Sequence, residues 1–359
     1  MTLRAGGALG VPFPLLCAAL LAEGVRLPSP AESPQVGNPS SVAEQARFAV
    51  VRPFWKGDIP GLENALRFMR SNHTACANGT LPVDLVLYYS GGKDDIIDDQ
   101  DAAAGLAPKN GSKVGELLAG LTGKLAAGAG CFREVRVKYS DWSAGYGYPS
   151  APCMQFMEMM NHHTGVFWGY QAIYQMELDV RPVRETWLEH ILPIMEDAAR
   201  GKFWVVGGTY NLRCMALLDN EKATLWDRKV GHRADVDAYL QRLNTWWTDG
   251  HINGNAVYSS SADFRSWVQK RWPKDGRPRC ARKGQYDGVF FGESRTKVAG
   301  AAIANKWLHS DNFVDCKPVG PHSQEARTMP LEEVRKRFPT AMLAHVDDTV
   351  LGSARPHHS

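Results

Sequence analysis

The first half of the chain alternates short apolar runs with longer amphipathic segments. The runs at 48–51, 84–89 and 134–139 have the length and the aromatic and β-branched content typical of strands. Between them, 60–71 and 113–127 carry apolar residues at helical spacing. Because strands that alternate with helices form parallel sheets, this half predicts an α/β fold, a mostly parallel sheet with helices on both faces.

The pattern continues less regularly through the middle of the chain. We expect a helix over 156–174, a strand over 174–180, a helix over 185–199 and a strand over 203–208. Two more helices are predicted, over 236–247 and 331–338. Ligands of open α/β sheets bind at the carboxyl ends of the strands, so the residues that follow each strand are the candidates for a site.

Composition divides the chain into four segments. An apolar stretch over 9–21 predicts a signal peptide or a signal anchor within 1–26, with a disordered leader as the alternative. Residues 27–46 are rich in Pro, Ser and Asn and predict a flexible stalk. A single catalytic domain over 47–316 and a polar C-terminal tail over 317–359 complete the organisation.

Glycosylation sequons and cysteines favour the secretory pathway. The sequons begin at Asn72, Asn78 and Asn110, all in polar stretches typical of loops. Beyond the leader there are six cysteines, which form either three disulfides in one of 15 connectivities or buried free thiols; they are Cys76, Cys131, Cys153, Cys214, Cys280 and Cys316. We therefore expect a luminal glycoprotein, with the Golgi as its compartment.

The charge balance excludes one class of partner. A formal net charge of +3 over 359 residues lacks the basic excess of a general nucleic-acid binder, so we expect no nucleic-acid partner.

The acidic triplet Glu177-Leu178-Asp179 is the main candidate for chemistry. It closes an apolar run, and two acids spaced by one residue point to the same side of an extended chain. Carboxylate oxygens suit Mg²⁺ or Mn²⁺, and such a cation binds phosphate oxygens. The alternative is a solvated strand end that carries two acids by chance.

In this order of elements the chain resembles the GT-A class of glycosyltransferases. Glu177-Leu178-Asp179 is similar to the acidic metal motif of that class, with Glu in the first acidic place. The block His251-Ile252-Asn253-Gly254-Asn255 and the segment Trp307-Leu308-His309 also resemble proteins of this superfamily. The resemblance implies a nucleotide-sugar donor, a glycan or glycoconjugate acceptor and a cation held by Glu177, Asp179 and His309.

The resemblance also suggests which residues bind the two substrates. Donor contacts are expected from Arg52, Pro53, Lys93 and Asp179. Acceptor contacts are expected from Trp247, Asn253 and Asn255, because amides bind hydroxyls and an indole stacks on a sugar ring. Asp249 and His251 are the candidate catalytic bases. A Gly-capped helix end followed by a turn would also explain the Asp249-Gly250 pair.

Two other functions remain open on the sequence. A carbohydrate-binding protein without catalysis would explain the tryptophans and sequons equally well. The second is an ATP pyrophosphatase, because Ser90-Gly91-Gly92-Lys93-Asp94-Asp95 resembles its pyrophosphate loop. Asp95 stands where that loop has Ser, and its charge would repel phosphate.

Overall fold

We analysed a computed structural model, which describes residues 48–59, 61–62, 65–66, 75–77, 79–97, 111–126, 130–144, 146, 150–161, 165–209, 215–217, 252–270, 306–316, 326–328 and 330–346. The chain divides into two compact units, 1–43 and 44–359, and every described residue belongs to the second. The predicted leader and stalk, the three sequon asparagines and the predicted helix over 236–247 lie outside the described residues.

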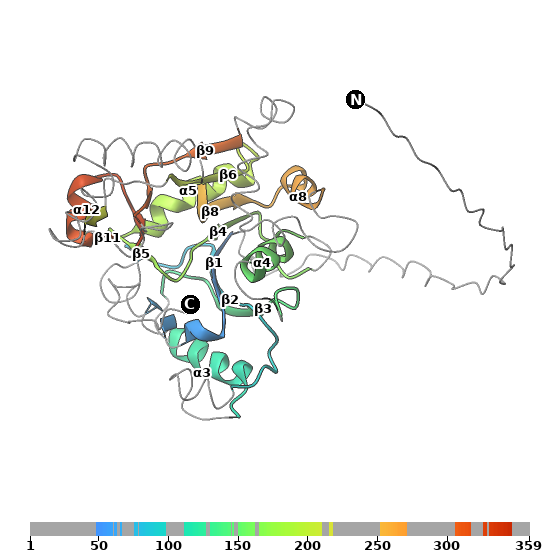
Figure 1. Cartoon of the computed structure of the whole chain (residues 1–359). Coiled ribbons are helices and arrows are strands. Elements are labelled where there is room, and N and C mark those ends of the chain that lie inside the picture. Colours follow the sequence, from blue (N-terminus) through green and yellow to red (C-terminus); the bar gives the residue numbers. More distant parts are fainter. Residues whose placement is uncertain are drawn as a thin grey trace, which may run out of the picture. The chain divides into compact units, whose positions relative to one another are not determined.

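A seven-stranded sheet forms the centre of the second unit (Figure 1). Its order is β3-β2-β1-β4-β8-β6-β9, and β8 alone runs antiparallel to its neighbours. The strands are β1 (Phe48–Phe54), β2 (Val83–Tyr89), β3 (Val135–Tyr139), β4 (Ala172–Gln175), β6 (Val205–Thr209), β8 (Ile252–Ser259) and β9 (Trp307–His309). The predicted mostly parallel α/β sheet is thus confirmed.

Helices cover both faces of this sheet. Val50 of β1 joins a buried cluster with α3 (Val114–Ala126) and α5 (Trp187–Ala199). Its neighbours Ala49 and Val51 join another cluster, with α4 (Ser150–Met160) and α8 (Ala262–Gln269). Since successive residues of a strand point to opposite faces, two apolar layers enclose the sheet. A short 3-10 helix, η1 (Lys56–Asp58), follows β1.

The middle of the chain differs from the prediction. The helix expected over 156–174 is α4, which begins earlier, with Pro152 in its first turn, and ends at Met160. Gly165 and Gly169 then adopt positive φ angles of 68° and 94°, which turn the chain into β4. Apolar content alone could not show this, because it is equally high in a buried helix and in a buried strand.

Two smaller sheets complete the unit. One has the order β10-β12-β5 and consists of β5 (Val180–Pro182), β10 (Phe313–Asp315) and β12 (Leu343–His345). The predicted C-terminal helix is α12 (Leu331–Arg337), and its Val334 packs in a buried cluster with Val314 and Ala344. The other sheet pairs β7 (Met215–Leu217) with β11 (Ala326–Thr328). The C-terminal segment, expected to be a polar tail with one short helix, therefore contributes that helix and two paired strands.

Disulfides tie the unit together. Cys76 and Cys131 are bonded to each other across a sequence separation of 55 residues. Cys153 and Cys316 each take part in a disulfide as well. The four cysteines among the described residues are thus oxidised rather than free thiols.

Within the described residues, no helix has both the length and the apolar character needed to span a membrane.

Candidate metal centre

The acidic triplet lies where the strand order of the main sheet reverses. From β1 the chain proceeds to β2 and β3 on one side, and β4 then pairs with β1 on the other side. Such a switch point creates a crevice at the carboxyl ends of the two flanking strands. Glu177, Leu178 and Asp179 follow β4 after one intervening residue, Met176, and therefore lie at this crevice.

The triplet is a turn between β4 and β5, not the end of a longer strand. β4 stops at Gln175, two residues before Glu177, and β5 begins at Val180. The predicted strand over 174–180 is thus interrupted. The carboxylates of Glu177 and Asp179 nevertheless point to the same place, because buried side chains hold the backbone of the turn.

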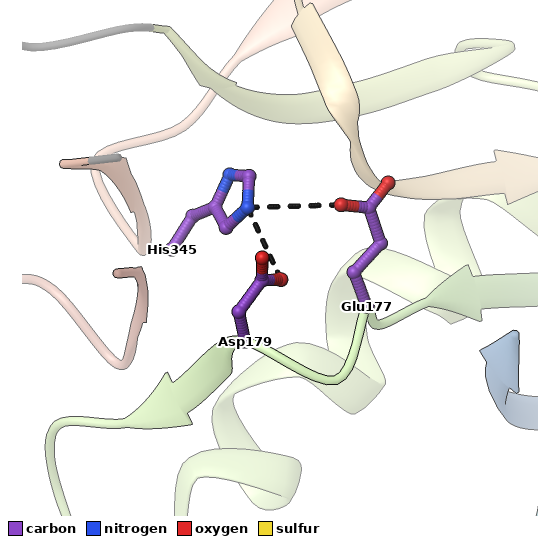
Figure 2. A group of neighbouring side chains, drawn as sticks. All are labelled: Glu177, Asp179 and His345. Atoms are coloured by element: carbon purple, nitrogen blue, oxygen red, sulfur yellow. Dashed lines mark ion pairs between the residues drawn. The ribbon is translucent and has the colours of Figure 1, made fainter. Parts of the chain in front are cut away.

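A histidine from the C-terminal segment completes the group (Figure 2). Nε2 of His345 lies 3.1 Å from Oδ1 of Asp179 and 3.6 Å from Oε2 of Glu177. Each of the three side chains offers one ligand atom, and these atoms all lie within 4.8 Å of one another. Asp179 and His345 are buried, whereas the Glu177 side chain is about one-third exposed, which leaves the group open on one side.

Pairing of β12 with β5 brings His345 to the acids. The two strands are antiparallel, and His345 is the direct partner of Val180, the residue after Asp179. The backbone N–H of Val346 also donates to the carbonyl of Asp179 at 3.2 Å. Long-range strand register therefore sets the position of the imidazole.

Three buried side chains hold the backbone of the turn. Arg52 donates from Nη2 to the carbonyl of Leu178 at 3.2 Å, and Nη1 of Arg181 donates to the same oxygen. Oδ1 of Asn255 accepts from the N–H of Glu177 at 2.8 Å. With the backbone anchored on both sides of Leu178, the two carboxylates are oriented before any ligand arrives.

Burial and neighbouring charges shift the pKa values of two of these groups. Burial and the nearby Arg181 lower the pKa of Arg52 to about 9. Burial alone would lower the pKa of His345, but the carboxylates of Asp179 and Asp315 outweigh it and raise that pKa to about 10. In the metal-free protein His345 is therefore an imidazolium at neutral pH, and it must lose a proton to coordinate a cation.

The donor atoms of this group suit a divalent cation. Two carboxylates and one imidazole are ligands that Mn²⁺ accepts, and carboxylates are the preferred ligands of Mg²⁺. Two atoms on opposite sides of a Mg²⁺ ion lie about 4.2 Å apart, and the three ligand atoms all lie within 4.8 Å of one another, so a single ion is within reach of all three. Glu177, Asp179 and His345 could thus hold one ion and leave further positions to a ligand.

A small pocket adjoins His345. Tyr174 and Asn255 are among its lining residues, and within the described residues Nδ2 of Asn255 has no hydrogen-bond partner. The lining residues are Tyr174, Val180, Gly208, Asn255, Phe313, Val314, Asp315, Leu343 and His345.

His309, the histidine that the sequence assigns to the metal, is not part of the group. It ends β9 at the edge of the main sheet, its side chain is exposed, and its strand partner is Gly207 of β6. His345 takes the expected place instead. No motif marks His345 in the sequence, and the only local signal is its position within a short apolar run, Leu343 to Val346.

The other predicted site residues fall into four groups. Arg52 is fully buried and donates to the backbone of the turn, and Pro53 follows it in β1, half-buried. Lys93 is exposed in the loop after β2. Asn253 and Asn255 lie on β8, whereas Trp247, Asp249 and His251 lie outside the described residues.

In the loop Ser90-Gly91-Gly92 after β2, the carboxylate of Asp95 lies against the glycines. Oδ2 of Asp95 accepts a hydrogen bond from the Tyr89 hydroxyl at 3.0 Å, which fixes the carboxylate beside Ser90-Gly91-Gly92. A fixed negative charge there opposes pyrophosphate binding, so the geometry does not favour an ATP pyrophosphatase.

No protein-family model matches the chain, and no curated protein matches it in sequence. Among solved structures, the chain is similar to the galactosyltransferase LgtC in complex with donor and acceptor sugar analogues, at 12% identity over 83% of this chain and 86% of that one, with a TM-score of 0.40. It is also similar to mouse xyloside xylosyltransferase 1, at 11% identity over 84% and 98% of the two chains and a TM-score of 0.39. A third similar structure is the S. cerevisiae mannosyltransferase Ktr4p with GDP, at 9% identity over 67% and 64% of the chains and a TM-score of 0.29.

Proposed function

We propose that this protein is a glycosyltransferase that uses a nucleotide-diphosphate sugar and a divalent cation, Mn²⁺ or Mg²⁺. The observation that carries the proposal is the convergence of Glu177, Asp179 and His345 at the switch point between β1 and β4. An acidic group at that place in a parallel sheet suits a cation that holds a phosphorylated ligand.

The chemistry of sugar transfer explains why such a group is useful. The bond that breaks joins the anomeric carbon to the diphosphate, and negative charge grows on the departing nucleoside diphosphate. A bound divalent cation supplies Lewis-acid stabilisation of that charge. Glu177, Asp179 and His345 would hold the cation, while Arg52 and Arg181 keep the turn of the two acids in place. Lys93, exposed in the loop after β2, is proposed to contact the same anion.

The acceptor side of the proposal rests on the sequence. An acceptor hydroxyl has to lose its proton if the enzyme inverts configuration, and Asp249 or His251 is the proposed base. Trp247 and Asn253 are proposed to bind the acceptor sugar. Asn255 has a second role, since its side chain already binds the backbone of Glu177.

A substitution of Asp179 tests the proposal. Asp179→Ala should abolish Mn²⁺-dependent binding of UDP and GDP, and it should also abolish hydrolysis of nucleotide sugars in the absence of acceptor. Asp311→Ala removes an exposed acid between β9 and β10 and serves as the matched control, with binding unchanged. If Asp179→Ala bound Mn²⁺ and nucleotide as well as the wild type, the metal role would be wrong. A carbohydrate-binding protein without catalysis would then explain the chain better.

We further propose that the protein is a glycoprotein of the secretory pathway, in the Golgi lumen, with its N-terminus as a signal peptide or an anchor. The disulfide-bonded cysteines support an oxidising compartment. Protein from a eukaryotic host should migrate faster on a gel after N-glycosidase treatment. Unchanged mobility, with Asn72, Asn78 and Asn110 intact, would count against luminal residence.

A further inference from the structure

The two ring nitrogens of His345 face different carboxylates. Nε2 lies beside Asp179 and Glu177, the acids of the turn. Nδ1 lies 3.1 Å from Oδ1 of Asp315, a residue that does not belong to the turn. Asp315 and His345 are 3% and 4% exposed, so the contact at Nδ1 is shielded from water.

Strand register fixes this contact. Asp315 in β10 and His345 in β12 are direct partners in a parallel pair, and His345 is in turn the partner of Val180 in β5. The N–H of Cys316 donates to the carbonyl of His345 at 2.8 Å, which locks the backbones together beside the contact. Directly opposed residues on adjacent strands point to the same face, so the carboxylate reaches the ring without a special turn.

We propose that Asp315 is a positioning residue that makes Nε2 the metal-binding nitrogen of His345. This inference rests on the proposed function, because it assigns a role in holding the cation. A neutral imidazole carries its proton on one nitrogen only. An acceptor at Nδ1 keeps the proton there, which leaves the Nε2 lone pair directed at the space between Asp179 and Glu177.

A role in positioning His345 would explain why a carboxylate, Asp315, is buried in β10. Asp315 follows Phe313 and Val314 in a buried strand, and a buried charge is costly unless it is paired. An apolar residue would satisfy the packing of β10. Nδ1 of His345, however, needs a hydrogen-bond acceptor. The pairing of β10 with β12 places the carboxylate of Asp315 beside this nitrogen.

The nitrogen that binds metal can be observed directly. The full chain, labelled with ¹⁵N-histidine and loaded with Zn²⁺ as a diamagnetic probe, should show His345 with Nδ1 protonated and Nε2 bound to metal. His345→Gln assigns the signal. Asp315→Leu removes the acceptor but keeps a side chain of similar size. In this variant His345 should no longer show only the state with Nδ1 protonated and Nε2 bound to metal. Asp315→Asn, which keeps an acceptor oxygen, should retain it.

A control separates positioning from general destabilisation. Asp84→Asn alters another buried carboxylate, one that binds Arg133, Arg136 and Tyr170 away from the site. It should lower stability and leave the His345 ring state unchanged. If Asp315→Leu does not fold, Asp315→Ala and the wild-type spectrum still decide.

The outcomes distinguish the two proposals. Metal bound through Nδ1 in the wild type, or an unchanged Nε2-bound state in Asp315→Leu and Asp315→Ala, would overturn the positioning role alone. If the wild type binds neither Zn²⁺ nor Mn²⁺, the metal-dependent function proposed above is wrong, and the positioning role is overturned with it.

Discussion

At the scale of single residues, two histidines allow the metal assignment to be tested side chain by side chain. Because His345 must lose a proton to bind Mn²⁺, affinity should rise with pH, by up to about tenfold per unit below its pKa of about 10. His345→Gln should remove this dependence. His309→Gln should retain it, because that ring lies outside the group. Titration calorimetry between pH 6.5 and 8.5 measures all three proteins, and equal slopes would contradict the assignment of His345.

The same histidine predicts how the stability of the metal-free protein depends on pH. Its pKa is about 10 in the folded state, above the ordinary value of 6.5. Its contribution is therefore fully present below about pH 6.5 and is lost as pH rises through 10. Thermal unfolding in EDTA should show a midpoint that falls over this range. The fall should be smaller in His345→Gln, and identical curves for both proteins would show that the ion pairs of His345 do not stabilise the fold.

At the scale of elements, the approach of β6 to β10 depends on Gly208. A Cβ at this position would lie 2.4 Å from the carbonyl oxygen of Phe313, so β10 would have to move. Gly208→Ala should cost about 1–3 kcal/mol of stability and should also weaken Mn²⁺ binding, because β10 carries Asp315. Urea unfolding and calorimetry measure the two effects.

An exposed glycine provides the matched control for that substitution. Gly120 lies within α3, and a Cβ there would meet nothing within 4 Å. Gly120→Ala should raise stability by up to about 1 kcal/mol and leave Mn²⁺ binding unchanged. If both alanine variants behaved alike, close contact at Gly208 would not be the cause.

At the scale of the whole molecule, the Cys76–Cys131 disulfide should stabilise the fold without touching the site. Cys131 lies just before β3, and its carbonyl accepts from the N–H of Leu81 just before β2, so the bond is at the amino ends of these strands. The double substitution by serine should cost about 2–5 kcal/mol. Mn²⁺ affinity of the folded variant should equal that of the wild type, and a loss of affinity would show that the site depends on this end of the sheet.

The sequence by itself determined the parallel α/β sheet and the acidic pair. Apolar runs and helical spacing are local properties, and they placed β1, β2, β3, α3 and α5 within a few residues of their observed bounds. Glu177 and Asp179 were identified in the same way, because their spacing and the preceding apolar run are local signals.

Only the tertiary structure decided which histidine joins the acids and what Arg52 does. The choice of His345 over His309 depends on the register of β12 against β5, a contact between segments far apart in the sequence. The burial of Arg52 beneath Leu178 likewise depends on the pairing of β1 with β4. Periodicity describes the faces of one element, whereas a site assembled from β4, β10 and β12 is defined by long-range pairing that no local pattern encodes.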